Sequence, residues 1–507
     1  MKKKENLRQR AYLNSITTLL DFGASQIAAF IANPFIVSGL GSTFYGVWQM
    51  LGQMTGYANL ADTRATQVLK WSIAKNRDTS TDAELRSEVT SALIVTAVIL
   101  PIVLIFGGVI SWYSPYITGV SSEYYNLVRI TCSLLILYLV TRKVFAIFES
   151  ILRGMNVGYK RMGIRAVIVL LGGGMKIAAI QLGYGLIGLA VTQVIVAVIT
   201  GMTLFFIVKK HIGWFGFGKT NFKKVISFGK LSGWFIAWTG ANMLLLGSDK
   251  LILGVIAGPA LVTKYTITMF ISLAVQGVVK NTIHGIIPGI AGIIGKKDYR
   301  NAIKIREHLM IITWLIVTSF GSVIVLLNES FIGLWIGDEH FAGNTVNLFM
   351  VLIIFQTVFI DNDNAIIKTT LDIRTNVLLS FGASAIYIIL AFILLKDYGI
   401  IGLCISIILG RSLLSFGFPY IINNKFTDKS SFSIIKIFKP LIVTIAVFGI
   451  SYLLAEIIII KSWIYLILTV PVALFAPSLI CWLFGLRSEQ RAALKDYYYK
   501  IKLFKND

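Results

Sequence analysis

The chain has 507 residues, of which 56% are hydrophobic and only 14% are charged, and its mean hydropathy is +0.78. This number of charged groups is too small to cover the surface of a soluble domain of this size. The composition therefore excludes an ordinary soluble protein. The 47 Lys and Arg residues outnumber the 24 Asp and Glu residues and leave a formal net charge of +23. The places where this charge interrupts the apolar segments therefore carry information about topology.

About fourteen apolar segments follow one another along the chain, each long enough for a helix that crosses about 30 Å of hydrocarbon. They lie at roughly 12–39, 43–70, 89–112, 124–152, 163–182, 185–208, 229–257, 259–293, 306–327, 344–369, 375–395, 398–422, 437–457 and 462–485. Most show little amphipathic striping, and the alternating ten-residue segments of a membrane β-barrel are absent. We expect an all-α polytopic membrane protein with about 14 transmembrane helices, the first of them an uncleaved N-terminal span.

The segments between the spans fall into two alternating sets. One set holds most of the Lys and Arg residues, including Lys75, Arg77, Lys160, Lys223 and Lys296, whereas the other is nearly free of them. Lys and Arg near span ends are retained in the cytoplasm. Both termini belong to the basic set, so both are expected to be cytoplasmic. Most of the positive charge is thus topological, and no basic folded module for nucleic acid is present.

The order of spans predicts five parts. Six spans form residues 1–208, a basic cytoplasmic linker covers 209–228, and six further spans cover 229–423. A terminal pair of helices at 424–485 and an interfacial basic tail at 486–507 complete the chain. Weak similarity between Gly39–Gly46 and Gly258–Tyr265 indicates repeated halves. In many transporters such repeats meet at the binding site.

Residues 213–220 match the phosphate-binding pattern G-x-x-x-x-G-K-[ST] completely. We expect this match to be coincidental, because the pattern works between a strand and a helix, and here it lies in a loop between membrane helices. Four scattered histidines and three cysteines inside spans give no metal or disulfide pattern. With no catalytic constellation in the sequence, we expect no catalytic residue, no metal and no enzyme.

Ionisable residues inside the spans are costly and usually face a cavity or a partner. The candidates are Asp21, Asp62, Arg64, Lys176, Asp249, Lys250, Lys264, Lys280 and His284. Lys264 is close enough to the outer membrane surface to extend its ammonium into water, so it is discounted. Asp21 and Arg64 lie at similar depth and are expected to form a structural ion pair. The adjacent Asp249 and Lys250 point in different directions on a helix, so each needs its own partner or water.

The deep cations predict an internal anion site. Lys176 follows three glycines that favour close helix packing, and Lys280 and His284 stack one helical turn apart beside Pro288. We therefore predict that a phosphate-linked substrate is bound by Arg64, Lys176, Lys250, Lys280 and His284. The acidic residues Asp21, Asp62 and Asp249 are assigned to charge pairing or to coupling with H⁺ or Na⁺, without any other cofactor.

Three motifs together resemble a known family. They are Pro34…Gly39-Leu40-Gly41…Tyr45-Gly46, then Ser248-Asp249-Lys250-Leu251-Ile252-Leu253-Gly254 with Gly258 and Tyr265, and Ile287-Pro288-Gly289-Ile290-Ala291 running into Lys296-Lys297-Asp298. Over nearly its whole length the chain resembles the polysaccharide-transporter branch, the Wzx-type O-antigen flippases, of the multidrug/oligosaccharidyl-lipid/polysaccharide (MOP) flippase superfamily. It departs from the family at Asp62-Thr63-Arg64, where an Asp-Leu-Gly-like step is usual.

The resemblance implies two six-helix lobes in a V shape around a cationic cavity, plus the terminal pair. It implies alternating access that moves an undecaprenyl-diphosphate-linked oligosaccharide, an O-antigen or capsule repeat unit, to the outer leaflet of the bacterial cytoplasmic membrane. Implied partners are this lipid, membrane lipids and other polysaccharide assembly proteins. Three alternatives remain: a multidrug cation antiporter of the superfamily, a membrane-embedded polysaccharide polymerase or ligase, and a non-transporting scaffold.

Overall fold

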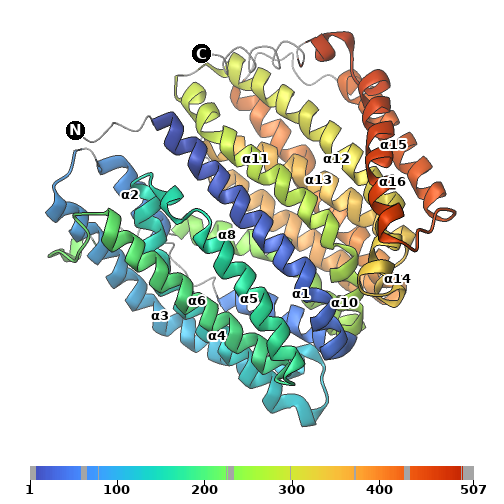
Figure 1. Cartoon of the computed structure of the whole chain (residues 1–507). Coiled ribbons are helices and arrows are strands. Elements are labelled where there is room, and N and C mark those ends of the chain that lie inside the picture. The colour runs from blue at the N-terminus through green and yellow to red at the C-terminus, as the bar shows by residue number, and fades with distance from the viewer. Residues whose placement is uncertain are drawn as a thin grey trace. The chain divides into compact units, whose positions relative to one another are not determined.

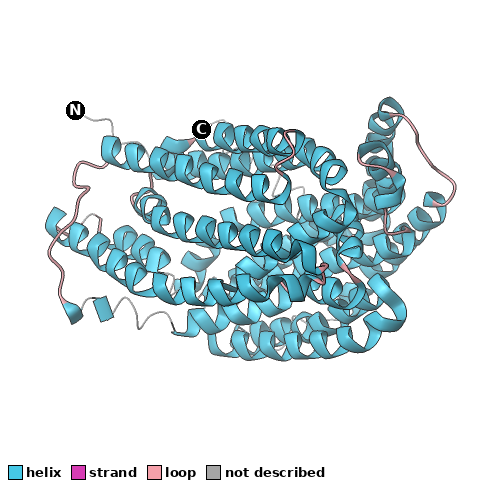
Figure 2. Ribbon diagram, turned by 90° about the horizontal axis from the view of Figure 1, so that it is seen from below, coloured by secondary structure: helices cyan, strands magenta, loops and turns pink. Residues whose placement is uncertain are grey.

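A computed structural model of the chain describes residues 7–58, 65–77, 79–223, 225–226, 233–296, 298–369, 373–426, 434–492 and 494. Within these residues the regular structure is entirely helical, and Figure 2 shows helices joined by short loops. Ten helices are long and apolar enough to cross a membrane, and two bent helix pairs bring the described total to as many as twelve. The all-α, multi-span fold expected from the sequence is confirmed.

Two of the ten helices each contain two spans. Helix α1 (Leu7–Ala58) and helix α14 (Ile373–Phe426) have 52 and 54 residues, and at about 1.5 Å per residue either is more than twice the membrane thickness. Each is interrupted by a glycine with positive φ, Gly41 (φ 72°) and Gly399 (φ 54°). A side chain at these positions would strain the backbone. With both halves counted, the described residues accommodate about fourteen spans, as the sequence predicts.

The contacts divide the chain into two compact units, Met1–Thr263 and Lys264–Asp507, and the boundary falls inside α10 (Pro259–Thr268). The first unit contains α1, α2 (Ala65–Asn76), α3 (Asp82–Thr118), α4 (Tyr125–Gly154), α5 (Ile164–Gln181), α6 (Gly185–His211), α8 (Gly233–Leu246) and α9 (Asp249–Ala257). Within it α4 packs on α3 and α6, and α5 packs on α1 and α6 (Figure 1). The beginning of α3 is fixed by its local sequence, because Thr81 and Glu84 form a capping box there.

The second unit contains α11 (Phe270–Gly295), α12 (Tyr299–Trp335), α13 (Asn344–Thr369), α14, α15 (Ile434–Ala455), α16 (Trp463–Ile480) and a π-helical turn at Cys481–Gly485. Helix α13 packs on α11, α12 and α14, while α15 and α16 both pack on α12. The outer faces of α15 and α16 expose large apolar side chains, including Ile445, Ile464 and Leu468 at 63–70%. Such faces suit a lipid environment.

Candidate functional site

A ladder of polar side chains joins the second half of α1 to α9 in the first unit. Gln49, Gln53 and Tyr57 are spaced four residues apart on α1 and so lie on one face of that helix. Lys250 Nζ donates to Gln49 Oε1 at 2.8 Å, and Gln53 Nε2 donates to Asp249 Oδ1 at 2.6 Å. The Tyr57 hydroxyl lies 2.6 Å from Ser248 Oγ. The ladder therefore uses three consecutive residues of the expected site region.

The ladder gives Asp249 and Lys250 separate partners. Both side chains are half-buried, and their hydrogen-bond partners are different glutamines of α1. Gln53 has a second role, because its Oε1 accepts from the backbone N–H of Leu251 at 3.1 Å and so satisfies a free amide in the first turn of α9. Lys250 is thus held by a neutral amide oxygen, and this contact leaves its positive charge in place.

The two similar segments that the sequence analysis singled out pack against each other. Gly46 lies so close to the backbone of Pro259 that a Cβ atom at this position would overlap the carbonyl. Thr263 Oγ1 donates to the carbonyl oxygen of Ser42 at 2.5 Å. One helical turn farther along α1, the fully buried Met50 packs against Gly254 of α9, where a side chain would overlap it. Gly46 and Gly254 therefore serve close helix packing, whereas Gly41 and Gly258 have open space and a positive φ.

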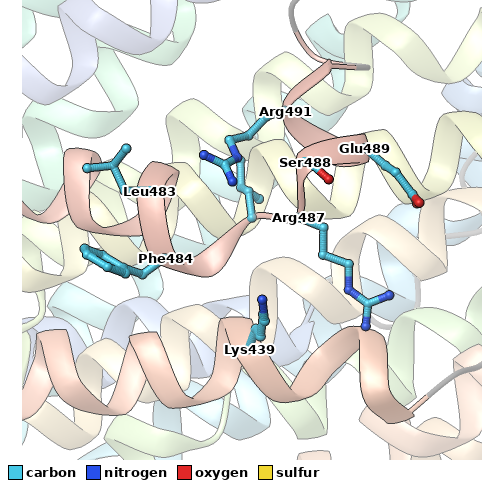
Figure 3. A pocket seen from close by; sticks show the side chains of 8 residues that line it. Lys439, Leu483, Phe484, Arg487, Ser488, Glu489 and Arg491 are labelled. Atoms are coloured by element: carbon cyan, nitrogen blue, oxygen red, sulfur yellow. The ribbon is translucent and has the colours of Figure 1, made fainter.

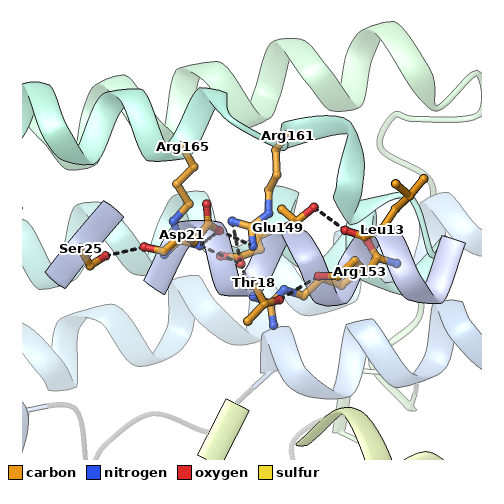
Figure 4. Close-up of polar contacts among 10 residues, drawn as sticks. Leu13, Thr18, Asp21, Ser25, Glu149, Arg153, Arg161 and Arg165 are labelled. Atoms are coloured by element: carbon orange, nitrogen blue, oxygen red, sulfur yellow. Dashed lines mark hydrogen bonds and ion pairs between the residues drawn. The ribbon is translucent and has the colours of Figure 1, made fainter. Parts of the chain in front are cut away.

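A second polar cluster joins α1, α4, α5 and the 3₁₀ turn Gly158–Arg161 of the first unit (Figure 4). Arg161 Nη2 lies 3.1 Å from Asp21 Oδ2, and Arg165 Nη1 lies 3.3 Å from Glu149 Oε1. Glu149 also pairs with Arg153 at 2.7 Å. Asp21 and Arg161 are buried, with exposures of 9% and 4%. Three guanidinium groups thus face two carboxylates.

This cluster gives Asp21 a partner that the sequence did not indicate. Arg161, which follows Asp21 by 140 positions and belongs to the loop before α5, pairs with it, and the expected pair with Arg64 is not tested. Arg64 and Asp62 lie outside the described residues, and the structure does not describe the side chain of His284. The roles assigned to these three residues stay predictions. From the sequence, Glu149 is discounted because it lies at the inner membrane surface, and Arg161 counts only toward topology because it lies in a basic loop.

Lys176 lies on α5, one helical turn after two close helix contacts. The neighbouring Gly172 faces Val196 of α6, and Gly173 faces Ala28 of α1. Lys176 itself is half-buried, and no residue in the described part of the chain makes a hydrogen bond or an ion pair with it. A half-buried ammonium in a membrane-spanning helix without a counter-charge is costly, which marks it as a functional candidate.

Two aspartates of the second unit, Asp361 and Asp363, lie on α13 and meet cations of the neighbouring helices. Arg306 of α12 forms a two-pronged pair with Asp363, with Nε–Oδ1 and Nη2–Oδ2 distances of 2.6 and 2.8 Å. Lys280 Nζ of α11 lies 3.6 Å from Asp361 Oδ2. Lys280 is therefore close to a carboxylate and half exposed, at 47%. Sequence reasoning missed both aspartates, although two carboxylates within the apolar segment 344–369 were a visible signal.

Arg411 is another cation that the sequence analysis did not single out. It lies in the second half of α14, is 8% exposed, and donates from Nη1 to Thr357 Oγ1 of α13 at 2.6 Å. The same two helices are joined by Gln356, which donates to the carbonyl oxygen of Ile408 at 3.0 Å. Arg411 lies near the middle of the apolar segment 398–422, and this position was the signal that could have identified it.

The segment that matches the phosphate-binding pattern is already engaged by the protein. Arg86 of α3 donates from Nε to the carbonyl oxygen of Trp214, and the Gly218 N–H donates to Thr90 Oγ1. Thr220 Oγ1 lies 2.6 Å from Ser91 Oγ. The loop thus packs on α3, and no strand precedes it in the described chain. The described residues also contain no group of three or more metal-ligating side chains.

Comparison with solved structures identifies the fold. An inward-facing multidrug resistance transporter of the MATE family, from the MOP superfamily, is 15% identical, with 79% of this chain and 96% of that chain covered and a TM-score of 0.60. A MOP superfamily transporter from Pyrococcus furiosus Vc1 is 13% identical, with coverages of 85% and 98% and a TM-score of 0.58. The lipid II flippase MurJ, inward closed, is 14% identical, with coverages of 93% and 99% and a TM-score of 0.68.

At these identities the similarity is one of fold. Neither a protein-family model nor a curated protein sequence matches the chain. The chain shares its fold with these solved transporters of the MOP superfamily, and its assignment to the superfamily and to the polysaccharide branch stays a prediction.

Proposed function

We propose that this protein is a transporter, and no enzyme, that flips an undecaprenyl-diphosphate-linked oligosaccharide between the leaflets of a bacterial cytoplasmic membrane. The observation that carries the proposal is Lys176, a half-buried cation in a membrane-spanning helix without a described counter-charge. Lys250 supports it, because its partner is the neutral amide of Gln49. An anionic headgroup would supply the charge that Lys176 lacks and would add to the interaction of Lys250 with the adjacent Asp249.

The physical chemistry of the substrate explains why such cations are useful. A diphosphate carries its charge into a region where ion transfer costs many kcal/mol, and fixed cations lower that barrier. The apolar tail of the lipid has no comparable barrier and can stay in the bilayer. The same proposal includes cytoplasmic termini, two lobes at residues 1–208 and 229–423 that alternate in access, and coupling to H⁺ or Na⁺ through Asp21, Asp62 or Asp249.

A multidrug cation antiporter is the second candidate, since a MATE transporter shares the fold. The fold alone does not distinguish a cationic from an anionic substrate. For the Pyrococcus furiosus transporter of the same fold, a binding pocket of reversed polarity is described as suggesting a different function. A cation site needs acidic groups free to meet the drug. Here Asp363 lies beside Arg306, Asp21 beside Arg161 and Asp361 beside Lys280. Lys176, by contrast, has no partner among the described residues, and this difference favours an anionic cargo.

The test is flipping of a fluorescent lipid-diphosphate-oligosaccharide in proteoliposomes, with and without a proton or sodium gradient. We expect flipping by the wild type and a loss of about 10- to 100-fold in Lys176→Gln, the equivalent of one charged hydrogen bond of roughly 1.5–3 kcal/mol. Lys461→Gln, which removes an exposed lysine between α15 and α16, should flip normally. Drug-cation exchange by a protein that flips no such lipid would overturn the proposal in favour of the antiporter.

A further inference from the structure

The second unit holds a basic pocket outside the residues discussed so far. It has a volume of about 540 Å³ and is lined by Lys439, Leu483, Phe484, Leu486, Arg487, Ser488, Glu489 and Arg491. Lys439 lies near the beginning of α15, and the other residues directly follow α16, so the pocket lies at one end of this helix pair. Three cations and one carboxylate leave it with a net positive charge.

The segment that carries the arginines is firmly anchored. Leu486 is 2% exposed and belongs to a buried cluster with Trp314, Val443 and Cys481. The backbone N–H of Arg487 donates to Gln490 Oε1 at 3.0 Å, and that of Arg491 donates to the carbonyl oxygen of Arg487 at 3.0 Å. The pocket is therefore a preformed feature of the fold, and no ordering of a free tail is needed to assemble it.

The charges of the pocket are arranged to receive an anion. Arg491 Nε is buried, and in the described part of the chain no hydrogen-bond acceptor faces it. Figure 3 shows Lys439 rising from α15 toward the segment with Arg487 and Arg491, whereas Glu489 points away to the side. A phosphate accepts several charge-assisted hydrogen bonds at once and would satisfy the free guanidinium donor.

An exposed apolar stripe leads from the membrane interior to the same pocket. Phe475, Leu479 and Leu483 repeat every four residues, and Phe484 extends the stripe; their exposures are 43–67%. From Phe475 to Phe484 the helix rises about 14 Å, close to the roughly 15 Å of hydrocarbon in one leaflet. A ligand that fits both features has a phosphate head and an apolar tail.

We propose that this pocket binds the phosphate headgroup of an anionic phospholipid, with one acyl chain lying along the α16 stripe. Basic pockets between membrane helices bind anionic lipid headgroups in this way. The leaflet is the cytoplasmic one in the orientation proposed above, but the binding itself does not depend on the transported substrate. The lipid would hold the ends of α15 and α16 together through Lys439 on one side and the arginines on the other.

Native mass spectrometry of the purified full chain tests the proposal with phosphatidylglycerol and phosphatidylcholine as probes. We expect preferential binding of phosphatidylglycerol. The substitutions Lys439→Gln, Arg487→Gln and Arg491→Gln should each lower this affinity about fivefold, as expected for the loss of one cation near an anionic headgroup. Glu489→Gln should raise it, and Lys461→Gln at the opposite end of the helix pair should leave it unchanged.

Three outcomes would overturn the proposal. Unchanged phosphatidylglycerol binding in the triple Gln variant would show that the lipid binds elsewhere. Displacement of the lipid by soluble glycerol phosphate at equal concentration would show a site for free phosphate that ignores the tail. Binding of undecaprenyl diphosphate more than tenfold tighter through the same three cations would assign the pocket to the transported lipid.

Discussion

Replacing Asp363 with asparagine tests the buried ion pair between α12 and α13. The substitution keeps the shape of the side chain but removes the charge that faces Arg306, whose Nε and Nη2 lie 2.6 and 2.8 Å from the two carboxylate oxygens. The two side chains are only 14% and 5% exposed. Water therefore cannot replace the lost carboxylate, and the buried guanidinium keeps only the weaker attraction of Glu307.

The expected loss is large. Breaking one side of a buried pair costs about 3–5 kcal/mol. At roughly 2–4 °C per kcal/mol for a unit of this size, the unfolding temperature should fall by about 6–20 °C. Thermal unfolding of the purified protein in detergent, followed by tryptophan fluorescence, measures the shift. The matched control is Asp397→Asn, which neutralises an exposed aspartate of α14 and should change the midpoint by less than about 2 °C.

A double variant sharpens the test. Arg306→Met with Asp363→Leu replaces the pair by apolar side chains of similar volume, and such replacements are often close to neutral. Most of the stability lost in Asp363→Asn should therefore return. The reasoning would be refuted if Asp363→Asn unfolded at the same temperature as Asp397→Asn, or if the double variant were less stable than the single one.

Two further predictions concern the contacts of α1 with α10 and with α9. Gly46→Ala should destabilise by about 1–3 kcal/mol or more, because its methyl group would meet the rigid backbone carbonyl of Pro259. Gly52→Ala on the same helix meets open space and should be neutral or slightly stabilising, so equal midpoints for the two variants would contradict the packing. Gln53→Leu should lower the unfolding midpoint by several degrees, since it removes the side-chain hydrogen bonds of Gln53 to Asp249 and to the backbone N–H of Leu251. Gln53→Glu should restore only the bond to the Leu251 N–H.

Local sequence information was sufficient for some features of the candidate site. That Asp249 and Lys250 need separate partners follows from the 100° turn between successive helical residues, and the structure supplies Gln53 and Gln49. The identities of these partners did not follow, since they lie about 200 positions away in the chain. For the same reason the sequence did not indicate Arg161 as a partner of Asp21, whereas the expected pair of Asp21 with Arg64 stays a prediction.

The sequence by itself determined the all-helical membrane fold and the number of spans. Both depend on the length and polarity of continuous segments, because the hydrocarbon core accepts only a chain that satisfies its own backbone. Only the tertiary structure decided which charges are neutralised by a partner. It leaves Lys176 with no described partner, and it brings Lys439, Arg487 and Arg491 together in a pocket. Charge pairing depends on distances of a few ångströms between helices that are far apart in the chain, and hydropathy carries no information about those distances.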